Sequence, residues 1–380
     1  MEDQMVSGER ASSTISTRRS SGRLMKLEAI RGFAALYVLV AHFANVILNF
    51  PKWTFFLRFA TEAVGLFFLI SGFVIYYSTF AQSKELVARD YFVKRFRRIY
   101  PLFIFSIIVS YCFASVAAHA LMPLELKTLI GNLLMLQDFK FGRPGVWFRG
   151  YYNPVFWSLS YEWWYYVLFY FVSRLIVDGK KQQYAVFAVA LFGFALTMVY
   201  PNQPALYLKA FMSWWCGVEL AREYCQSGVI TWKKQRTTIG LLAIMSAVSF
   251  MPVLALKLHH HPIQSGLYPM NDFRLMSCAL WYVILGVIWQ RWQFVGFRWT
   301  FGWFAVVAPI SYGIYIFHYP ALLLLDKCFR YPSPAVEFVA LLGVAFLLAY
   351  FFEVRVQRHI NRWTRAHLLT TKTRVTKLAP

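Results

Sequence analysis

Ten apolar stretches, separated by short polar segments, dominate the chain after residue 26. Each is about 18–23 residues long, the length that an α-helix needs to cross the hydrocarbon core of a bilayer. We therefore predict an all-α integral membrane protein with about ten transmembrane helices and no soluble domain. The expected spans are 30–50, 63–80, 99–120, 157–176, 183–201, 205–222, 237–256, 273–291, 304–326 and 335–354.

The polar segments around these stretches divide the chain. Residues 1–26 are rich in Ser, Thr and Arg and contain no apolar run of the kind found in signal peptides, so we expect a disordered basic tail. Its three acidic residues argue against a mitochondrial transit peptide. We expect residues 27–356 to form one multi-pass membrane domain and residues 357–380 a second basic tail. The internal segment 121–156 is expected to be re-entrant or to lie at the membrane surface.

The composition fits a membrane protein and excludes an ordinary soluble one. Of the 380 residues, 59% are hydrophobic and 15% are charged, whereas soluble proteins are about 25% charged. The five cysteines lie in or beside apolar stretches without the spacing of a metal-binding motif. We therefore expect neither a disulfide framework nor a metal site.

The charge is strongly basic, with 39 Lys and Arg against 17 Asp and Glu and a net charge of +22. Such an excess often indicates a nucleic-acid partner. Here, however, 27 of the 39 basic residues lie in the tails and in the loops that ten spans would place on the same side as the tails. By the positive-inside rule that side is the cytoplasm, so both termini are expected there. The lipid bilayer accounts for the excess, and we expect no nucleic-acid partner.

Two ionisable residues lie inside the first span, where charge is costly and commonly functional. Arg31 and His42 are 11 residues apart, which corresponds to about 16 Å along a helix and to nearly the same face. The span would then present a cation near the cytoplasm and an imidazole beyond its middle. The alternative is an arginine that reaches the membrane surface and a hydrogen-bonded core histidine.

Two more ionisable residues are expected at about the depth of His42. Glu162 lies in the outer third of the fourth span, within a run of Trp and Tyr, and His318 lies past the middle of the ninth. Ser311, Tyr315 and His318 are spaced by four and three residues and so share a helical face. Three helices would bring polar groups to a common depth. An aromatic belt with Glu162 in contact with water is the simpler alternative.

A basic cluster, Lys94–Arg98, directly precedes the third span. Positive-inside placement alone explains such a cluster. The functional alternative is an anion site, because guanidinium groups bind phosphates and coenzyme A carries several. Arg95 and Arg98 would share a face if the helix begins before the apolar stretch.

Five short motifs occur in the order seen in a known family. They are Arg31 and His42 with ten residues between them, Ser71-Gly72-Phe73, Arg95-x-x-Arg98 followed by Ile99-Tyr100-Pro101, Trp157-Ser158-Leu159-x-x-Glu162, and Ser311-Tyr312-x-x-Tyr315-x-x-His318. In these motifs the chain resembles the bacterial integral-membrane acyltransferase-3 family. It departs from the family in the last span, where the usual Glu-x-Pro is Glu353-Val354-Arg355.

The resemblance implies an O-acyltransferase of the bacterial cytoplasmic (inner) membrane. It implies acyl-CoA, chiefly acetyl-CoA, as co-substrate, no tightly bound cofactor, and a hydroxyl of a surface or exported carbohydrate as acceptor, such as exopolysaccharide or lipopolysaccharide. The expected CoA-binding residues are Arg31, Arg95 and Arg98, and the expected catalytic residues are His42, Glu162 and His318. Nothing in the sequence indicates an oligomeric state.

On this basis we expect the imidazole of His42 to act as general base on the acceptor hydroxyl. Glu162 would hold the His42 tautomer or bind the sugar, and His318 would hydrogen-bond the thioester oxygen. Direct transfer and transfer through an acyl-enzyme on Ser71 or Ser158 both stay open. A secondary transporter with a relay of buried Arg, His and Glu is the alternative from another class, and a non-catalytic scaffold without any cavity is a third.

Overall fold

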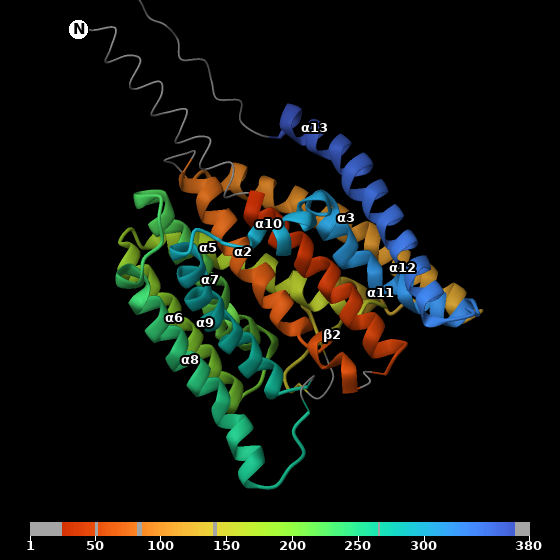
Figure 1. The fold of residues 1–380 in the computed structure, drawn as a ribbon, viewed down its shortest axis with the longest axis horizontal. Coiled ribbons are helices and arrows are strands. Elements are labelled where there is room, and N and C mark those ends of the chain that lie inside the picture. The colour runs from red at the N-terminus through yellow and green to blue at the C-terminus, as the bar shows by residue number, and fades with distance from the viewer. Residues whose placement is uncertain (1–24, 50–51, 82–85, 140–142, 265–266, 369–380) are drawn as a thin grey trace, which may run out of the picture.

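The computed structural model describes residues 25–49, 52–81, 86–139, 143–264 and 267–368, and nearly all of this part of the chain is helical (Figure 1). The long helices are the first helix (Met25–Val46), α2 (Ala60–Phe80), α3 (Ala88–Ala117), α5 (Trp157–Leu175), α6 (Gly179–Val199), α7 (Gln203–Ser227), α8 (Trp232–Leu258), α9 (Met270–Arg291), α11 (Ser311–Cys328) and α12 (Pro334–Ala349). The short elements are η1 (Lys52–Leu57), α4 (Leu126–Leu133), β1 (Gln137–Asp138), β2 (Phe148–Arg149), η2 (Pro154–Phe156), α10 (Phe297–Thr300), η3 (Gly302–Val306) and η4 (Ala308–Ile310). After α12 the chain continues through a π-helix, η5 (Tyr350–Val356), into α13 (Gln357–His367).

A long helix lies at each of the ten expected spans, and the prediction of an all-α membrane protein is confirmed. Eight of them are long and apolar enough to cross a bilayer within the described residues. The other two are α5 and α7. Most of α7 is buried by neighbouring helices, so its charged residues face protein rather than lipid. The expected tails lie largely outside the described residues, although the first part of the second one forms α13.

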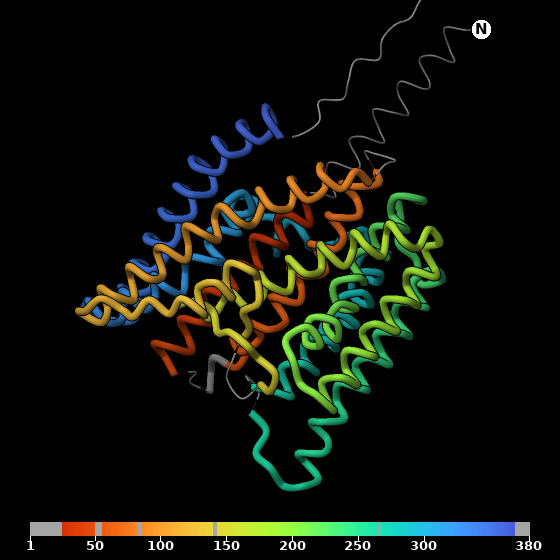
Figure 2. Tube along the Cα trace, turned by 180° about the vertical axis from the view of Figure 1, so that it is seen from behind, coloured from red at the N-terminus to blue at the C-terminus, as the bar shows by residue number. Residues whose placement is uncertain are grey.

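The helices form one bundle, in which the first helix and α2 lie between two groups (Figures 1 and 2). On one side α7 packs against α2 and α6, and α8 packs against α9; on the other, α11 packs against α3 and α12. The start of the first helix and the end of α13 lie at the same end of the bundle, which we call the terminal face (Figure 1). The first helix and α3 begin near this face, whereas α2 begins at the opposite face and ends here.

Glycines allow α2 and α7 to approach closely. A Cβ atom on Gly72 would lie 2.2 Å from the carbonyl oxygen of Trp214, and one on Gly217 would lie 2.0 Å from that of Leu69. Each glycine thus meets the backbone of the other helix, which is how small residues permit tight helix packing in membranes. The position of α2 matters because it borders both cavities described below.

The expected re-entrant or surface segment, 121–156, is partly buried within the bundle. It contains α4 and a two-residue parallel pairing of β1 with β2, in which Gln137 faces Phe148. Asn132 is fully buried, and its side-chain amide donates to the carbonyl oxygen of Arg149 at 2.8 Å. Buried amides of this kind satisfy irregular backbone that would otherwise be costly away from water.

Candidate active site

Two cavities lie between the helices, and they contain five of the six predicted site residues. The arginine cavity has a volume of about 430 Å³, and its lining includes Arg31, Arg95, Arg98 and Glu162. The histidine cavity has a volume of about 440 Å³, and its lining includes His42. The predicted cations and the predicted base therefore belong to different cavities.

The two cavities meet at Val64 and Tyr315, which line both of them. The arginine cavity follows α2 from Ser78 back to Val64, a distance of about 21 Å at 1.5 Å per residue. Its end near the terminal face is basic and includes Lys94 and Arg97. The lining at its other end is mainly apolar and includes Val64, Phe67, Phe68 and Leu159.

Arg95 and Arg98 reach the arginine cavity because α3 begins at Ala88, well before the expected span at residue 99. The guanidinium of Arg95 lies over the rings of Tyr91 and Tyr166, at 5.4 and 5.8 Å from their centroids. Its Nε atom is buried and has no hydrogen-bond partner within the described residues. A buried donor without a partner is costly, and a bound anion would satisfy it.

Arg98 is anchored by Glu353, which lies two residues before Arg355, the position at which the last span departs from the Glu-x-Pro pattern. Nη1 of Arg98 lies 3.3 Å from the Glu353 carboxylate, which also accepts a hydrogen bond from the backbone N–H of Gly313 at 2.6 Å. Glu353 lies in the π-helix η5, and its side chain is 4% exposed. The Arg98 side chain is 40% exposed. Glu353 is therefore held firmly within the protein, while the guanidinium of Arg98 still faces the cavity.

A proline in α3 positions the last helix at the mouth of the arginine cavity. Because Pro101 has no N–H, the carbonyl of Arg97 lacks its usual helical donor. The side chain of Gln357 donates to that carbonyl instead, at 2.6 Å. As a result, Gln357 and Asn361 join the lining of the cavity.

Arg31 lines the same cavity, but the protein itself occupies most of its donors. Nε donates to Ser311 Oγ at 3.0 Å, and Nη2 donates to the carbonyl of Ala308 at 3.0 Å. An ion pair of 2.6 Å joins the same guanidinium to Glu28. Arg31 therefore ties the first helix to the start of α11.

His42 and His318 are in direct contact. Nε2 of His318 lies 3.0 Å from Nδ1 of His42, and the ring centroids are 5.1 Å apart. Nδ1 of His318 lies 3.2 Å from the carbonyl oxygen of Ile314. A carbonyl oxygen can only accept, so in a neutral pair Nδ1 of His318 carries its proton and Nε2 accepts from His42.

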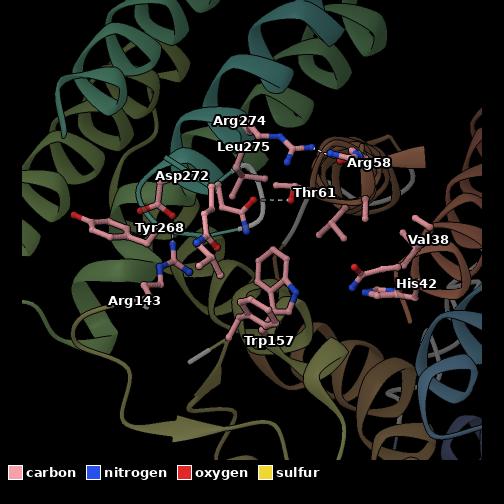
Figure 3. Close-up of a pocket in the computed structure, with 18 of the residues that line it drawn as sticks. Val38, His42, Arg58, Thr61, Arg143, Trp157, Tyr268, Asp272, Arg274 and Leu275 are labelled. Atoms are coloured by element: carbon pink, nitrogen blue, oxygen red, sulfur yellow. Dashed lines mark hydrogen bonds and ion pairs between the residues drawn. The ribbon is translucent and has the colours of Figure 1, made fainter. Parts of the chain in front are cut away.

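This arrangement leaves Nε2 of His42 with a lone pair. Figure 3 shows the His42 ring pointing from the first helix into the histidine cavity. The pair therefore offers a base to the cavity, held in one tautomer by a chain of hydrogen bonds that ends on the backbone.

Glu162 lines the arginine cavity and not the cavity that contains His42. Its carboxylate accepts hydrogen bonds from Ser71 Oγ, at 2.7 Å, and from the Tyr166 hydroxyl. The expectation that Glu162 holds the His42 tautomer must be corrected, because Nδ1 of His42 is bonded to His318. The expected bond from His318 to a thioester oxygen also fails, because both nitrogens of that ring have other partners.

The wall of the histidine cavity opposite the imidazole carries charges that sequence reasoning missed (Figure 3). Arg143 forms ion pairs with Asp138 and Asp272, and Lys209 also pairs with Asp272. Burial alone would lower the pKa of Arg143, but Asp272, Tyr161 and Asp138 raise it, so the guanidinium stays charged. Asp272 is 129 residues from Arg143 and 63 residues from Lys209 in the chain, and no motif or spacing connects it to them.

A second proline positions the boundary between the cavities. Pro320 in α11 leaves the carbonyl of Ile316 without its helical donor, and the side-chain amide of Asn153 donates to it at 2.9 Å. This bond holds the start of α5 against α11. There the hydroxyls of Ser158 and Tyr315 lie 2.7 Å apart.

Comparison with known proteins identifies the family that this chain matches. A family model described as an acyltransferase domain, that of the acyltransferase-3 family, matches residues 26–354. The match covers most of the chain and includes all six predicted site residues. No solved structure matches the chain.

Two curated bacterial proteins are similar to parts of the chain. Nodulation protein 10 of Rhizobium leguminosarum bv. viciae is 37% identical over 98 residues, which are 25% of this chain and 26% of that protein. Acyltransferase MdmB of Streptomyces mycarofaciens is 32% identical over 161 residues, which are 40% of each chain. The matches therefore span less than half the length of either relative.

Proposed function

This chain belongs to the acyltransferase-3 family, and from that premise we propose that it carries an acyl group from cytoplasmic acyl-CoA to a carbohydrate hydroxyl across the bacterial inner membrane. The family and the acyltransferase name of one relative support a membrane O-acyltransferase. One observation carries the rest of the proposal. A basic cavity near the terminal face and a cavity with a base near the opposite face meet at a shared wall.

The donor binds in the arginine cavity. Its phosphates contact Arg95 and Arg98, which suit phosphate oxygens because guanidinium groups donate in a planar fork. The pantetheine arm is long and narrow, and the cavity extends about 21 Å along α2 towards the shared wall. The basic residues of the tails and of the loops on the terminal face support a cytoplasmic position for that face.

The acceptor binds in the histidine cavity. Trp157 and Tyr268 supply aromatic surface for the apolar faces of a sugar, and Asn45 and Asp272 supply hydrogen-bonding groups for its hydroxyls. This combination favours a carbohydrate, and a surface or exported one such as exopolysaccharide or lipopolysaccharide would reach the cavity from the opposite face.

The histidine pair supplies the proton chemistry. The acceptor hydroxyl gives its proton to Nε2 of His42 while its oxygen attacks the thioester carbonyl. The new C–O bond forms, the C–S bond breaks, and His42 returns the proton to the departing thiolate. The products are an O-acyl ester and CoA with a free thiol. General-base help of this kind contributes about 10²–10⁴-fold to the rate.

The His42→Ala variant tests this proposal. In proteoliposomes with acetyl-CoA and a panel of methyl glycosides, we expect the rates of thiol release and of ester formation to fall by about 10²–10⁴-fold. The KM for acetyl-CoA should change little, because His42 lies outside the arginine cavity.

The matched control is His260→Ala, in an exposed loop outside both cavities. It should retain the wild-type rate. A folded His42→Ala protein with near wild-type turnover would contradict the general-base role. A wild-type protein that moves glycosides across the bilayer without releasing thiol would favour the transporter alternative instead.

A further inference from the structure

We infer that Val64 and Tyr315 form the wall that ends the acyl-binding part of the arginine cavity and limits the donor to a short, uncharged acyl group. The inference rests on the proposed function, because it assumes that a CoA thioester occupies this cavity. It adds the side chains that limit the size and charge of the acyl group.

The wall is one layer of side chains thick. Val64 and Tyr315 border both cavities, so nothing further separates the two spaces at these residues. Val64 is only 4% exposed. The ring of Tyr315 packs against Phe67 at a centroid distance of 5.4 Å, and its hydroxyl is bonded to Ser158 at 2.7 Å. Packing and a hydrogen bond therefore hold the wall in place.

The reaction has to take place at this wall. The cations for the donor phosphates lie towards the terminal face, and the base lies in the other cavity. Among the residues that the structure describes, only Val64 and Tyr315 line both cavities. The thioester carbonyl and the acceptor hydroxyl therefore meet beside them, and the carbons beyond the carbonyl lie against the same side chains.

The chemistry of this end of the cavity selects an uncharged group. Its lining is chiefly apolar, from Val64 and Phe67 on α2 and Leu159 on α5. The lysine and arginines of the cavity come from the first helix and α3 and not from α2 or α5. A carboxylate on the acyl chain, as in succinyl-CoA, would lose its hydration there without gaining a cationic partner.

The decisive experiment compares acyl donors in three proteins. Wild type, Val64→Ala and Val74→Ala are assayed in proteoliposomes with acetyl-, butyryl-, hexanoyl- and succinyl-CoA, and kcat/KM is obtained from thiol release. Val74 is the matched control, because it lines the same cavity on the same helix, ten residues closer to the terminal face.

We expect the wild-type protein to prefer acetyl-CoA and to use hexanoyl- and succinyl-CoA poorly. Val64→Ala should raise the hexanoyl-to-acetyl ratio of kcat/KM by about tenfold, since a change of one or two methyl groups in an apolar pocket alters discrimination by about 10–200-fold. Val74→Ala should keep the wild-type ratio. Val64→Ile, which narrows the same wall, should lower the butyryl-to-acetyl ratio and serves as a second test if Val64→Ala unfolds.

The two proposals fail differently. If acetyl-CoA is turned over but the Val64 variants keep the wild-type ratios, the wall does not select the acyl group and this inference is overturned alone. Efficient use of succinyl-CoA by the wild-type protein would also overturn it. If the folded wild-type protein turns over none of the donors, the proposed function is wrong. The inference about the wall is then wrong as well, because it depends on that function.

Discussion

The His318 side chain is fully buried, and both of its ring nitrogens are bonded within the protein. In the mechanism that we propose, His318 would therefore act only through the orientation and tautomer of His42. We expect His318→Leu to lower kcat by about 10²-fold, which is the size of effect that a misplaced catalytic group produces. The KM for acetyl-CoA should stay the same, because His318 does not line the arginine cavity.

The conservative variant His318→Gln separates positioning from packing. Its amide oxygen can accept the proton of His42 Nδ1 in place of the imidazole nitrogen, so part of the kcat should return. Steady-state thiol release in proteoliposomes measures kcat and the KM for acetyl-CoA. Equal losses in the Leu and Gln variants, or a parallel rise in KM, would argue against the positioning role.

At the scale of single residues, the sequence predicts which groups are present and roughly how deep they lie, but not which of them touch. Helical spacing relates Arg31 to His42 because both belong to one helix. It says nothing about how that helix is rotated against α5 or α11. For this reason the contact between His42 and His318, and the separation of Glu162 from both, emerge only from the packed structure.

At the scale of elements, the close packing of α2 against α7 depends on two glycines. Gly72→Ala and Gly217→Ala each place a Cβ atom against the backbone of the other helix, and we expect each to lower the free energy of unfolding by about 1–3 kcal/mol. Gly240→Ala is the control, because nothing lies within 4 Å of its added Cβ. Thermal unfolding in detergent measures all three variants, and equal Tm values for them would contradict this account.

The ten apolar stretches predict the long helices well, because length and hydropathy are properties of one segment. Their ends are predicted less well. Amphipathic turns extend α3 on the side of its basic cluster, beyond the apolar core of the span. The segment 121–156 was the hardest to predict, since its order depends on partners such as the α11 carbonyl that Asn153 reaches.

At the scale of the whole molecule, the distribution of basic residues predicts which face meets the cytoplasm. A protease site added after Pro380 should be cut only in inverted membrane vesicles. A His260→Cys variant, with the exposed Cys112 and Cys225 changed to Ser, should react with an impermeant maleimide only in right-side-out vesicles. The reverse pattern would invert the direction of acyl transfer that we propose.

The single layer of side chains between the two cavities also has an electrical consequence. Water in a cavity carries the potential of the solution it opens to, so the membrane voltage falls mainly across whatever separates two such cavities. A potential of 100 mV is worth about 2.3 kcal/mol for each elementary charge that crosses it. On the proposed function the two cavities open to opposite solutions, so the membrane voltage would fall mainly across the layer that contains Val64 and Tyr315. The proton transfer that we propose between the hydroxyl, His42 and the thiolate would then take place where the electric field is strongest.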